Sequence, residues 1–392
     1  MPKDKTITTS DPPVRLRRSL DVSLQGFFFF ALTLFMAAAA INSQANLLFG
    51  VFGLMIGVML VSLSISRLVL MKLLVVRGLP DHAVVGRRMT LTYEITNQKR
   101  FWPSLSVTVT ELNETDAFTR QPVAYMLHVA PGTTAVVPTD LIPQRRGLHV
   151  FERCQISTSF PFGFVKRSAL RIQKDTLLVY PSIGQVDPKL LLRFTAAEKS
   201  GAMLRPRRGG TDEFYGVKEY RSGENPRLIH WKRSARTGVL VSKEMTLVSP
   251  PRIMLFVDAH QKEQTTEEHA RVEQTIAMAG SLASHALEAG LMVGLYVWSD
   301  EWIHLPPNRG KRHCRDLMAA LATLPVNITH NAQRLLQQGS ESLKSGTTAV
   351  LLTPLEWEAS RAEQARGNLV VLSPLTPLGR SAFQFDSEVN FS

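Results

Sequence analysis

The sequence predicts a multidomain protein made of a two-helix transmembrane hairpin, an all-β domain and an α/β doubly wound domain. Two apolar runs without a charged residue, 26–41 and 45–65, predict the hairpin. Short segments between residues 76 and 182 alternate polar with apolar side chains, which is typical of half-buried strands. After residue 250, strand-like and helix-like segments alternate, and this order predicts a parallel sheet covered by helices.

Composition sets the frame for these parts. The chain has 392 residues, of which 44% are hydrophobic, enough to build substantial cores. Its formal charge of +12 favours an acidic protein, an anionic membrane or a nucleic acid as partner, without choosing among them. Cys154 and Cys314 lie far apart with no metal-ligand spacing around either, so we expect reduced thiols in a cytosolic compartment.

The hairpin is expected within residues 21–75, after a basic cytoplasmic segment, 1–20. Both apolar runs are near spanning length, and only residues 42–44 separate them, so the helices should be antiparallel neighbours. By the positive-inside rule both ends are cytoplasmic, because the flanks are basic and the tip is not; the flanking residues are Arg15, Arg17, Arg18, Arg67, Lys72 and Arg77. The alternative is a buried helical hairpin in a soluble protein.

The all-β domain is expected to cover residues 76–182. About seven short strands with a turn roughly every ten residues favour an immunoglobulin-like sandwich. The strands read most clearly from the alternation are 90–95, 106–112, 123–129, 134–141 and 148–156.

Residues 183–250 lead into the α/β domain and are most distinctive from 209 to 244, GGTDEFYGVKEYRSGENPRLIHWKRSARTGVLVSKE. Asn225 before Pro226 predicts a helix start, and Gly238 predicts its end. The spacing of Leu228, Trp231 and Ala235 predicts one packing face, with Trp231 as a core anchor and His230 as its hydrogen-bonded neighbour.

The rest of this predicted helix is strongly basic. Five cations form what we call the basic face: Arg221, Arg227, Lys232, Arg233 and Arg236. One interpretation is an electrostatic docking site for an acidic partner. The other is a solvated helix whose charges pair locally with Glu213, Glu219 and Glu224, and the sequence leaves both open.

The α/β domain is expected at residues 251–392. Apolar runs predict strands at 253–257, 291–298, 347–352 and 369–372. Amphipathic periodicity predicts helices at 265–289, 311–324, 332–343 and 356–365.

No catalytic motif is convincing, so we expect a protein that is not an enzyme and needs no cofactor. The nearest approach to a phosphate-binding loop, Gly310-Lys311, has Leu305 and Arg312 where the motif needs a glycine and a hydroxyl residue. Cys154 lies in a strand pattern and is expected to be a core thiol, and His230 has no nucleophile in a recognisable motif. His269 and His285 are too far apart on one helix to share an ion.

Nucleic-acid binding through the helix 227–236 is the alternative function, given Tyr220 and Trp231 beside the cations. We disfavour it because a membrane hairpin restricts access to chromosomal DNA and the aromatic residues occupy packing positions. Filter binding with a strong salt dependence would revive it.

Residues 209–244 carry an ordered set of matches to a known signature and resemble the bacterial family catalogued as domain of unknown function 58. The matching residues are Glu213, Phe214, Glu219, Tyr220, Gly223, Glu224, Ile229, His230, Trp231, Lys232, Ser234, Ala235 and Arg236. Arg146-Gly147 and the run SFPFGF at 159–164 also resemble the family, with Phe160 and Phe164 departing from its usual acid and leucine. The signature residues Glu213, Phe214, Glu219, Tyr220, Gly223, His230, Trp231 and Ala235 are expected to be structural, and the basic face to dock a partner.

The resemblance implies a von Willebrand factor type A-like domain after residue 250. Metal-binding versions of that domain hold magnesium with an aspartate-x-serine-x-serine motif, whereas Asp258 is followed here by Ala-His-Gln-Lys. Both hydroxyls are missing and Lys262 adds a cation, although Asp300 could supply a second carboxylate. We therefore expect a degenerate site at Asp258 and no bound metal.

The resemblance also implies a partner, because relatives are commonly paired with a MoxR-type AAA+ ATPase. We therefore expect a cytoplasmic adaptor or scaffold, anchored by two helices in the bacterial inner membrane, with both termini and the soluble domains in the cytoplasm. It would mediate protein–protein interaction in the assembly or maturation of a complex, with other membrane proteins as possible partners and nucleic acid disfavoured.

Overall fold

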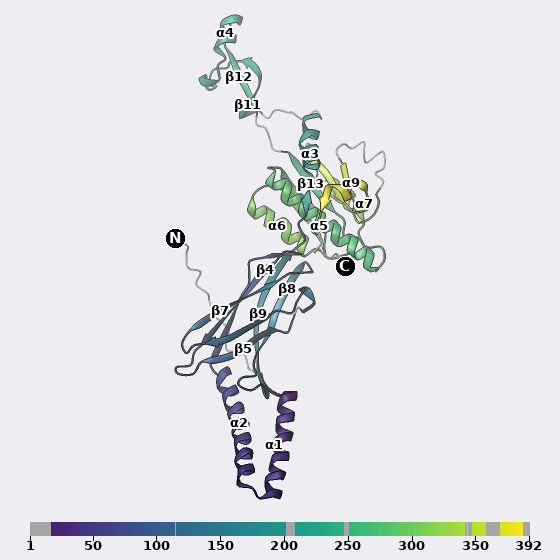
Figure 1. Cartoon of the computed structure of the whole chain (residues 1–392). Helices are drawn as coiled ribbons and strands as arrows, with labels where there is room; N and C mark the ends of the chain where they lie inside the picture. The colour runs from purple at the N-terminus through teal and green to yellow at the C-terminus, as the bar shows by residue number, and fades with distance from the viewer. Residues whose placement is uncertain are drawn as a thin grey trace. The chain divides into compact units, whose positions relative to one another are not determined.

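The computed structural model describes residues 17–113, 115–200, 208–246, 251–341, 343, 347–357 and 369–386 (Figure 1). The chain divides into two compact units, the first ending at Ser182 and the second beginning at Ile183. The first unit holds the helical hairpin and the β domain, and the second holds the signature segment and the α/β domain.

Two long apolar helices form the predicted hairpin. Helix α1 spans Leu24–Ser43 and α2 spans Asn46–Leu70, and they lie side by side as an antiparallel pair (Figure 1). Gln44 ends α1 in the left-handed conformation, with φ at 49°, and Ala45 precedes α2. Both helices are long and apolar enough to cross a membrane, and only 17% and 11% of their most apolar stretches are buried. Core helices of a soluble protein would be mostly buried, so this exposure weighs against that alternative.

Two sheets build the β domain. In one sheet β2 (Leu73–Gly78), β4 (Met89–Asn97) and β7 (Thr134–Leu141) lie in that order. The other has the order β1 (Arg17–Val22), β9 (Val165–Tyr180), β8 (Gly147–Thr158), β5 (Ser104–Glu111) and β6 (Val123–Val129), with β3 (Ala83–Val84) beside β9. A single turn of 3-10 helix, η1, covers Thr115–Ala117. All strand pairs except β3–β9 are antiparallel.

The two sheets share one hydrophobic core. Alternate residues of β4 are fully buried, among them Leu91 and Ile95, and they pack with Val109 of β5 and Leu177 of β9. This period of two is the pattern from which the strands were predicted. The two-sheet arrangement is therefore confirmed, while the immunoglobulin-like type stays a prediction.

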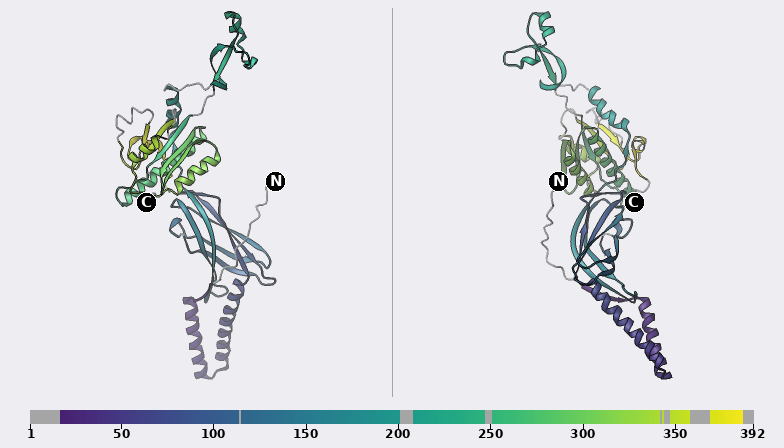
Figure 2. Two further views of the ribbon diagram at one scale, coloured as in Figure 1. Left: turned by 180° about the vertical axis from the view of Figure 1, so that it is seen from behind. Right: turned by 60° about the vertical axis from the view of Figure 1, so that its left-hand side comes forward.

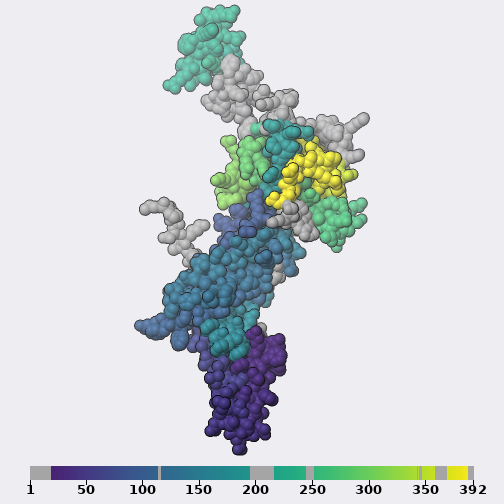
Figure 3. Space-filling model, viewed as in Figure 1, coloured from purple at the N-terminus to yellow at the C-terminus, as the bar shows by residue number. Residues whose placement is uncertain are grey.

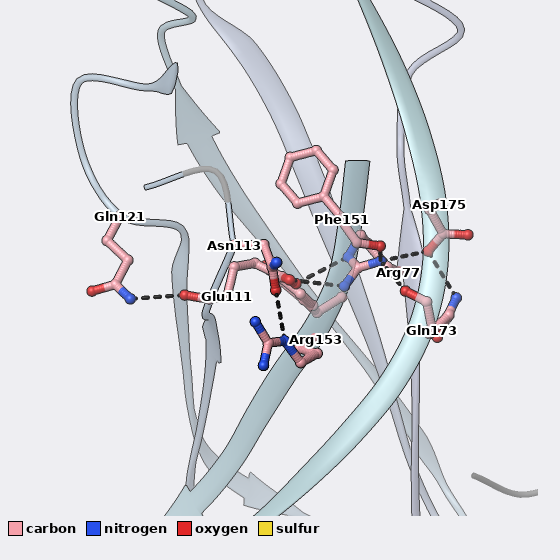
Figure 4. Close-up of polar contacts among 9 residues, drawn as sticks. Arg77, Glu111, Asn113, Gln121, Phe151, Arg153, Gln173 and Asp175 are labelled. Carbon is pink, nitrogen blue, oxygen red and sulfur yellow. Dashed lines mark hydrogen bonds and ion pairs between the residues drawn. The ribbon is translucent and has the colours of Figure 1, made fainter. Parts of the chain in front are cut away.

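A buried ion network crosses this core, as Figure 4 shows. The guanidinium of Arg77 on β2 donates to both carboxylate oxygens of Glu111, at 2.9 and 2.8 Å, and to Asp175 at 2.6 Å. Tyr93 donates its hydroxyl to the same Glu111 carboxylate at 2.9 Å. Burial lowers the pKa of Arg77, but the hydrogen bond and charge of Glu111 outweigh that effect and raise it overall. Burial, and then the Glu111 carboxylate, raises the pKa of Tyr93.

The hairpin flanks differ from the expected arrangement at two places. Arg77 was counted as a flanking charge, yet its side chain is only 2% exposed and belongs to the ion network. Residues 17–20 were expected in a basic N-terminal segment and residues 21–22 in the hairpin, whereas 17–22 form β1 and pair with β9. Strand pairing with a distant segment decides both positions, and local charge patterning carries no information about it.

The start of α1 is bonded to the turn between β8 and β9. Ser23 caps the helix by accepting from the Gly26 N–H, and its hydroxyl donates to the Gly163 carbonyl. A Cβ on Gly26 would lie 2.1 Å from the Phe164 carbonyl oxygen, so only glycine fits this approach. Phe29 stacks on Phe164 with ring centroids 4.3 Å apart. In Figure 3 the blue-green surface of the β8–β9 connection lies directly against the purple hairpin.

The end of α2 is bonded to the loop between β4 and β5. The ammonium of Lys99 donates to the carbonyls of Leu68 and Val69, at 2.8 and 2.9 Å, and to the Ser104 hydroxyl at 2.6 Å. The Leu68 carbonyl also accepts from the Met71 N–H at 3.3 Å, and a cation at a helix C-terminus is stabilising. Burial lowers the pKa of Lys99 to about 8. Both helices are thus joined to the β domain by specific polar contacts.

The α/β domain is built on a five-stranded sheet with the order β15-β14-β13-β16-β17. The strands are β13 (Arg252–Val257), β14 (Met292–Trp298), β15 (Trp302–Asn308), β16 (Thr347–Leu352) and β17 (Leu369–Leu372). All neighbours are parallel except β14 and β15. The predicted strands are confirmed, but β15 was missed because Pro306 and Pro307 argue against a strand; both lie on an edge strand, where proline is tolerated.

Helices cover both faces of this sheet (Figure 2). Helix α5 (Thr266–Glu288) contacts β13, β14 and β16 and also packs against α6 (Lys311–Ala322). On the opposite face Ala332 and Leu335 of α7 (Ala332–Ser340) pack on Met254 and Phe256. The remaining elements are β10 (Gln185–Val186), α3 (Pro188–Ser200), α9 (Pro377–Ala382) and β18 (Phe383–Gln384), with β10 paired to β18. Most of the helix predicted at 356–365 lies outside the described residues.

Candidate functional site

The signature segment folds as a small unit of its own. Strands β11 (Arg208–Glu219) and β12 (Val241–Thr246) pair as an antiparallel ribbon. Between them the chain forms a single 3-10 turn, η2 (Pro226–Leu228), and a short helix, α4 (Trp231–Thr237). The basic face lies on and around these two helical pieces.

The predicted single helix is therefore divided into two. Asn225 starts the first piece as expected, since its side chain accepts from the Arg227 N–H at 3.1 Å. The chain then becomes extended at Ile229, and His230 caps α4 by accepting from the Arg233 N–H at 3.3 Å. Gly238, with φ at 71°, ends α4 as predicted.

Several signature residues hold this unit together. The Tyr220 hydroxyl donates to the Glu224 carbonyl at 3.0 Å, and Gly223 adopts a left-handed φ of 101° that favours glycine. Ser234 accepts from the Val241 N–H at 2.9 Å, which fastens α4 to β12. His230 serves the same contact, because its N–H donates to the Val241 carbonyl at 2.8 Å. For these residues a structural role agrees with the geometry.

Trp231 is not a core anchor. Its side chain is 66% exposed, and Ala235 and Glu219 are also exposed. Val239 and Leu240, at the approach to β12, are large apolar residues that are exposed as well. Trp231, Val239 and Leu240 are called the apolar trio below. The backbones of Glu213 and Phe214 lie in β11, while their side chains fall outside what the structure describes.

All five side chains of the basic face are exposed. In the part of the chain that the structure describes, none of them forms an ion pair. Glu224, one of the expected local partners, is instead bonded to Lys218 at 2.7 Å and to the Ser242 hydroxyl at 3.1 Å. These contacts, with the Lys218 hydrogen bond the largest, lower the pKa of Glu224. Among the described side chains, the interpretation with local pairing therefore loses Glu224, while pairing with Glu213 lies outside the described residues.

A second candidate site is the carboxyl end of the α/β sheet, where Asp258 follows β13. Its Oδ2 accepts from the Thr353 hydroxyl at 2.9 Å, and its Oδ1 accepts from the His260 N–H at 3.0 Å. Thr353 follows β16, the parallel neighbour of β13, so the carboxylate ties two strand ends together. We missed Thr353 from the sequence, although a hydroxyl directly after an apolar strand was the available signal.

Burial raises the pKa of Asp258 to about 6, against the opposing effects of its hydrogen bonds and of His260. The Nδ1 atom of His260 is buried and has no hydrogen-bond partner among the described residues. Within the same residues no group of three or more His, Cys, Asp or Glu side chains could hold a metal ion. The metal independence of this domain stays a prediction, and the visible role of Asp258 is to join two strand ends.

Asp258→Asn is expected to change how stability depends on pH. Below about pH 4 the carboxyl is protonated in both the folded and unfolded states, so nothing is lost there. Between about pH 4 and 6 the unfolded state releases its proton first, so the free energy of unfolding falls with rising pH, by up to about 3 kcal/mol. The asparagine variant should lack this fall and be more stable than the intact chain at neutral pH. Denaturant unfolding followed by tryptophan fluorescence at several pH values measures it.

The exposed Asp300 provides the matched control, and Asp300→Asn should leave the pH dependence unchanged. The opposite outcome is a free energy of unfolding of Asp258→Asn that falls with rising pH as steeply as that of the intact chain. That result would contradict the prediction that the ionised Asp258 carboxylate destabilises the fold.

The cysteines agree with the expected core and free thiols. Cys154 is buried in the β-domain core and Cys314 is partly buried, and neither forms a disulfide. Burial raises the pKa of Cys154 to about 11, and burial also raises that of Cys314. Since the thiolate is the reactive form, neither position favours nucleophilic chemistry.

Comparison with known proteins gives one curated relative and weak structural likenesses. The Uncharacterized protein YeaD of Bacillus subtilis (strain 168) is 23% identical over 229 residues, which cover 58% of this chain. The chain spans only 56% of the length of that relative. The CARDB domain of a Pyrococcus furiosus protein aligns with 28% of this chain and 94% of its own at 12% identity and a TM-score of 0.20. A beta-glucosidase from Listeria innocua aligns with 28% of this chain and 16% of its own at 15% identity and a TM-score of 0.18.

Structural likenesses at such low TM-scores establish no shared fold. The matched region begins within β11 and therefore contains the basic face, the apolar trio and Asp258. Residues 216–371 match the family model described as Protein of unknown function DUF58.

Proposed function

We propose that the chain is a membrane-anchored adaptor that binds a protein partner through the basic face and the apolar trio. Helices α1 and α2 cross the bacterial inner membrane in this proposal, and both termini and the soluble domains lie in the cytoplasm. The β domain is an immunoglobulin-like sandwich, and the α/β domain is of the von Willebrand factor type A kind. Neither catalysis nor a cofactor is part of the function.

The observation that carries this proposal is the exposure of large apolar side chains near cations that form no ion pair with any side chain the structure describes. Trp231, Val239 and Leu240 are each at least 46% exposed, in a small segment whose described core is little more than Ile229. Aromatic residues and arginine are enriched at the centres of protein interfaces, where they contribute most of the binding energy. Burial of Trp231, Val239 and Leu240 against a partner would be favourable, whereas a solvated helix gains nothing from their exposure.

The partner we propose is a MoxR-type AAA+ ATPase, which the family resemblance implies. A surface that complements the basic face would be acidic around an apolar pocket for Trp231. Opposite charges across such an interface speed association and fix its orientation, and salt weakens them. Binding should therefore weaken as ionic strength rises without disappearing, because burial of the apolar trio is much less sensitive to salt.

Co-purification from a detergent extract tests the proposal. The variant reverses four charges, with Arg227, Lys232, Arg233 and Arg236 each changed to glutamate, and we expect it to lose an AAA+ ATPase that the intact chain retains. The matched control reverses four exposed cations on and before α6, namely Arg309, Lys311, Arg312 and Arg315, and should retain the ATPase. Absence of the ATPase from the intact chain, or equal loss in both variants, would contradict docking at the basic face.

Nucleic-acid binding remains a second candidate, because one reason for disfavouring it has gone. Trp231 was expected in a packing position, yet it is exposed among cations, where a base could stack. Filter binding of single-stranded nucleic acid separates the candidates. Under the adaptor proposal, retention is weak and does not depend on Trp231; under the alternative, Trp231→Ala removes most of it.

A further inference from the structure

The end of the β domain next to the hairpin exposes aromatic side chains on two separate loops. Phe101 and Trp102, in the β4–β5 loop, are 75% and 59% exposed, and Phe162, in the β8–β9 turn, is 47% exposed. Exposed aromatic residues gathered at one end of a domain indicate a contact with a protein partner or with a membrane. The position of these residues next to α1 and α2 favours the membrane.

The β8–β9 turn lies at the depth where α1 enters the membrane under the proposed anchoring. Helix α1 has 20 residues and is about 30 Å long, which equals the thickness of the hydrocarbon core. Its first residues therefore lie at the boundary. Phe164 stacks on Phe29, which lies more than one turn inside α1, and Phe162 stacks on Phe164 with centroids 5.7 Å apart. The turn thus reaches at least to the membrane interface.

The β4–β5 loop lies at the same boundary through its contacts with α2. Lys99 binds the last carbonyls of that helix, and Phe101 and Trp102 follow directly. Asn97, which is fully buried, fixes the loop by donating to the Trp102 carbonyl at 3.0 Å and to the Val129 carbonyl at 3.1 Å. The aromatic side chains are therefore held by a built loop and not by a free one.

The charges around these aromatic residues fit an anionic lipid surface. Arg67, Lys72 and Arg100 are exposed near the end of α2, and the Arg100 guanidinium lies 5.1 Å from the Phe101 ring centroid. Lys166 faces Asp21 across the β1–β9 pair, so that position adds little net charge. Tryptophan favours the headgroup level of a bilayer, and cations there attract the anionic lipids of the cytoplasmic leaflet.

We propose that the β domain is itself a membrane-contacting module, which seats Phe101, Trp102 and Phe162 in the interface of an anionic bilayer. The inference rests on the membrane anchoring of the proposed function. It adds that the β domain is held against the lipid surface at two loops and does not swing freely on the hairpin. The contacts of Ser23 and Lys99 with the two helix ends make this geometry rigid.

Site-specific fluorescence in vesicles tests the inference with the full chain. Cysteines replace Trp102 and Phe162 one at a time in a Cys314→Ser background, and each is labelled with an environment-sensitive dye. The protein is reconstituted in vesicles of phosphatidylcholine and phosphatidylglycerol that carry spin labels at shallow or deep positions. We expect a blue-shifted emission at both sites and a greater loss of intensity with the shallow label.

Two further positions separate the possible failures. Leu148 is exposed at the opposite end of β8, about 35 Å from Thr158 along the strand, and a dye there should show neither shift nor quenching. Leu34 lies exposed in the middle of α1, and a dye there should be quenched more by the deep label. The inference alone is overturned if the dye at position 34 is quenched while the dyes at positions 102 and 162 show neither a blue shift nor quenching. That result would leave the membrane anchoring intact. Absence of quenching at 34 overturns the anchoring, and the inference with it.

A measurement without labelling guards against disturbance by the dye. Brominated lipids should quench part of the tryptophan emission of the unmodified chain, and Trp102→Phe should remove that part. Equal quenching of the unmodified chain and Trp102→Phe would contradict an interfacial Trp102.

Discussion

Replacing Arg77 with alanine is expected to lower the free energy of unfolding of the β domain by about 3–5 kcal/mol, because Glu111 then stays buried without its cation. Glu111 is fully buried, and Tyr93 supplies only a neutral hydrogen bond to it. Hydrogen exchange of amides in β4 and β5, followed by mass spectrometry in detergent, measures the loss. Arg88→Ala is the control, since its pair with Asp140 is exposed and 3.9 Å long, and it should cost less than about 1 kcal/mol.

A double replacement separates the charge from the packing. Arg77→Met combined with Glu111→Leu removes both ions and should recover much of the stability that Arg77→Met alone loses. If Arg77→Met alone lowers the free energy of unfolding by no more than Arg88→Ala does, the buried ion network does not stabilise the packing of β2 against β5 and β9.

Gly26→Ala is expected to separate α1 from the β8–β9 turn. The new Cβ would lie 2.1 Å from the Phe164 carbonyl oxygen, so the helix or the turn must shift. The shift would break the bond between Ser23 and Gly163 and the stacking of Phe29 on Phe164, with a cost of about 1–3 kcal/mol. Exchange of the amides in the turn, including that of Gly163, should become faster.

Gly57→Ala is the matched control for this change. It places the same methyl group on α2, where no described atom beyond the adjoining turns of its own helix lies within 4 Å, so it should leave the turn unaffected. Equal exchange of the turn in both variants would mean that α1 and the β domain are not coupled at Gly26, and would weaken the inference about the membrane interface.

The sequence predicted most of the fold because the core of each domain repeats a regular pattern. The alternation around Leu91, Tyr93 and Ile95 predicts the buried face of β4, and all three side chains are fully buried. The amphipathic period at 265–289 predicts helix α5 in the same way, and Thr265 caps that helix by accepting from the Glu268 N–H at 3.3 Å. Where the period of the sequence and the packing agree, local reasoning was sufficient.

The failures occurred where a distant segment decides the structure. Arg77 is paired with Glu111 and Asp175, which lie on strands far along the chain, so its charge was misread as a membrane flank. Trp231 was assigned to a packing face from its spacing. The helix, however, has only seven residues, and the described part of its segment offers almost no core to cover. A helical period over so few residues does not report burial.

The candidate site was predicted in its residues but not in its arrangement. The cations of the basic face were identified correctly as exposed, because a charged side chain stays in water unless a buried partner binds it, as Glu111 binds Arg77. The exposed apolar side chains of the same segment were not predicted, because the local sequence around Val239 and Leu240 does not indicate whether another segment covers them. The combination of exposed apolar side chains with exposed cations is the reason why this surface is a candidate interface.

The most direct test of the central claim is the binding of the purified intact chain and its four-charge-reversed variant to the co-purifying ATPase across a range of salt concentrations. We predict that the intact chain binds, that its affinity falls as salt rises, and that the reversed variant binds weakly at every concentration. Equal affinity of the two proteins at low salt would contradict the claim that the basic face docks the partner.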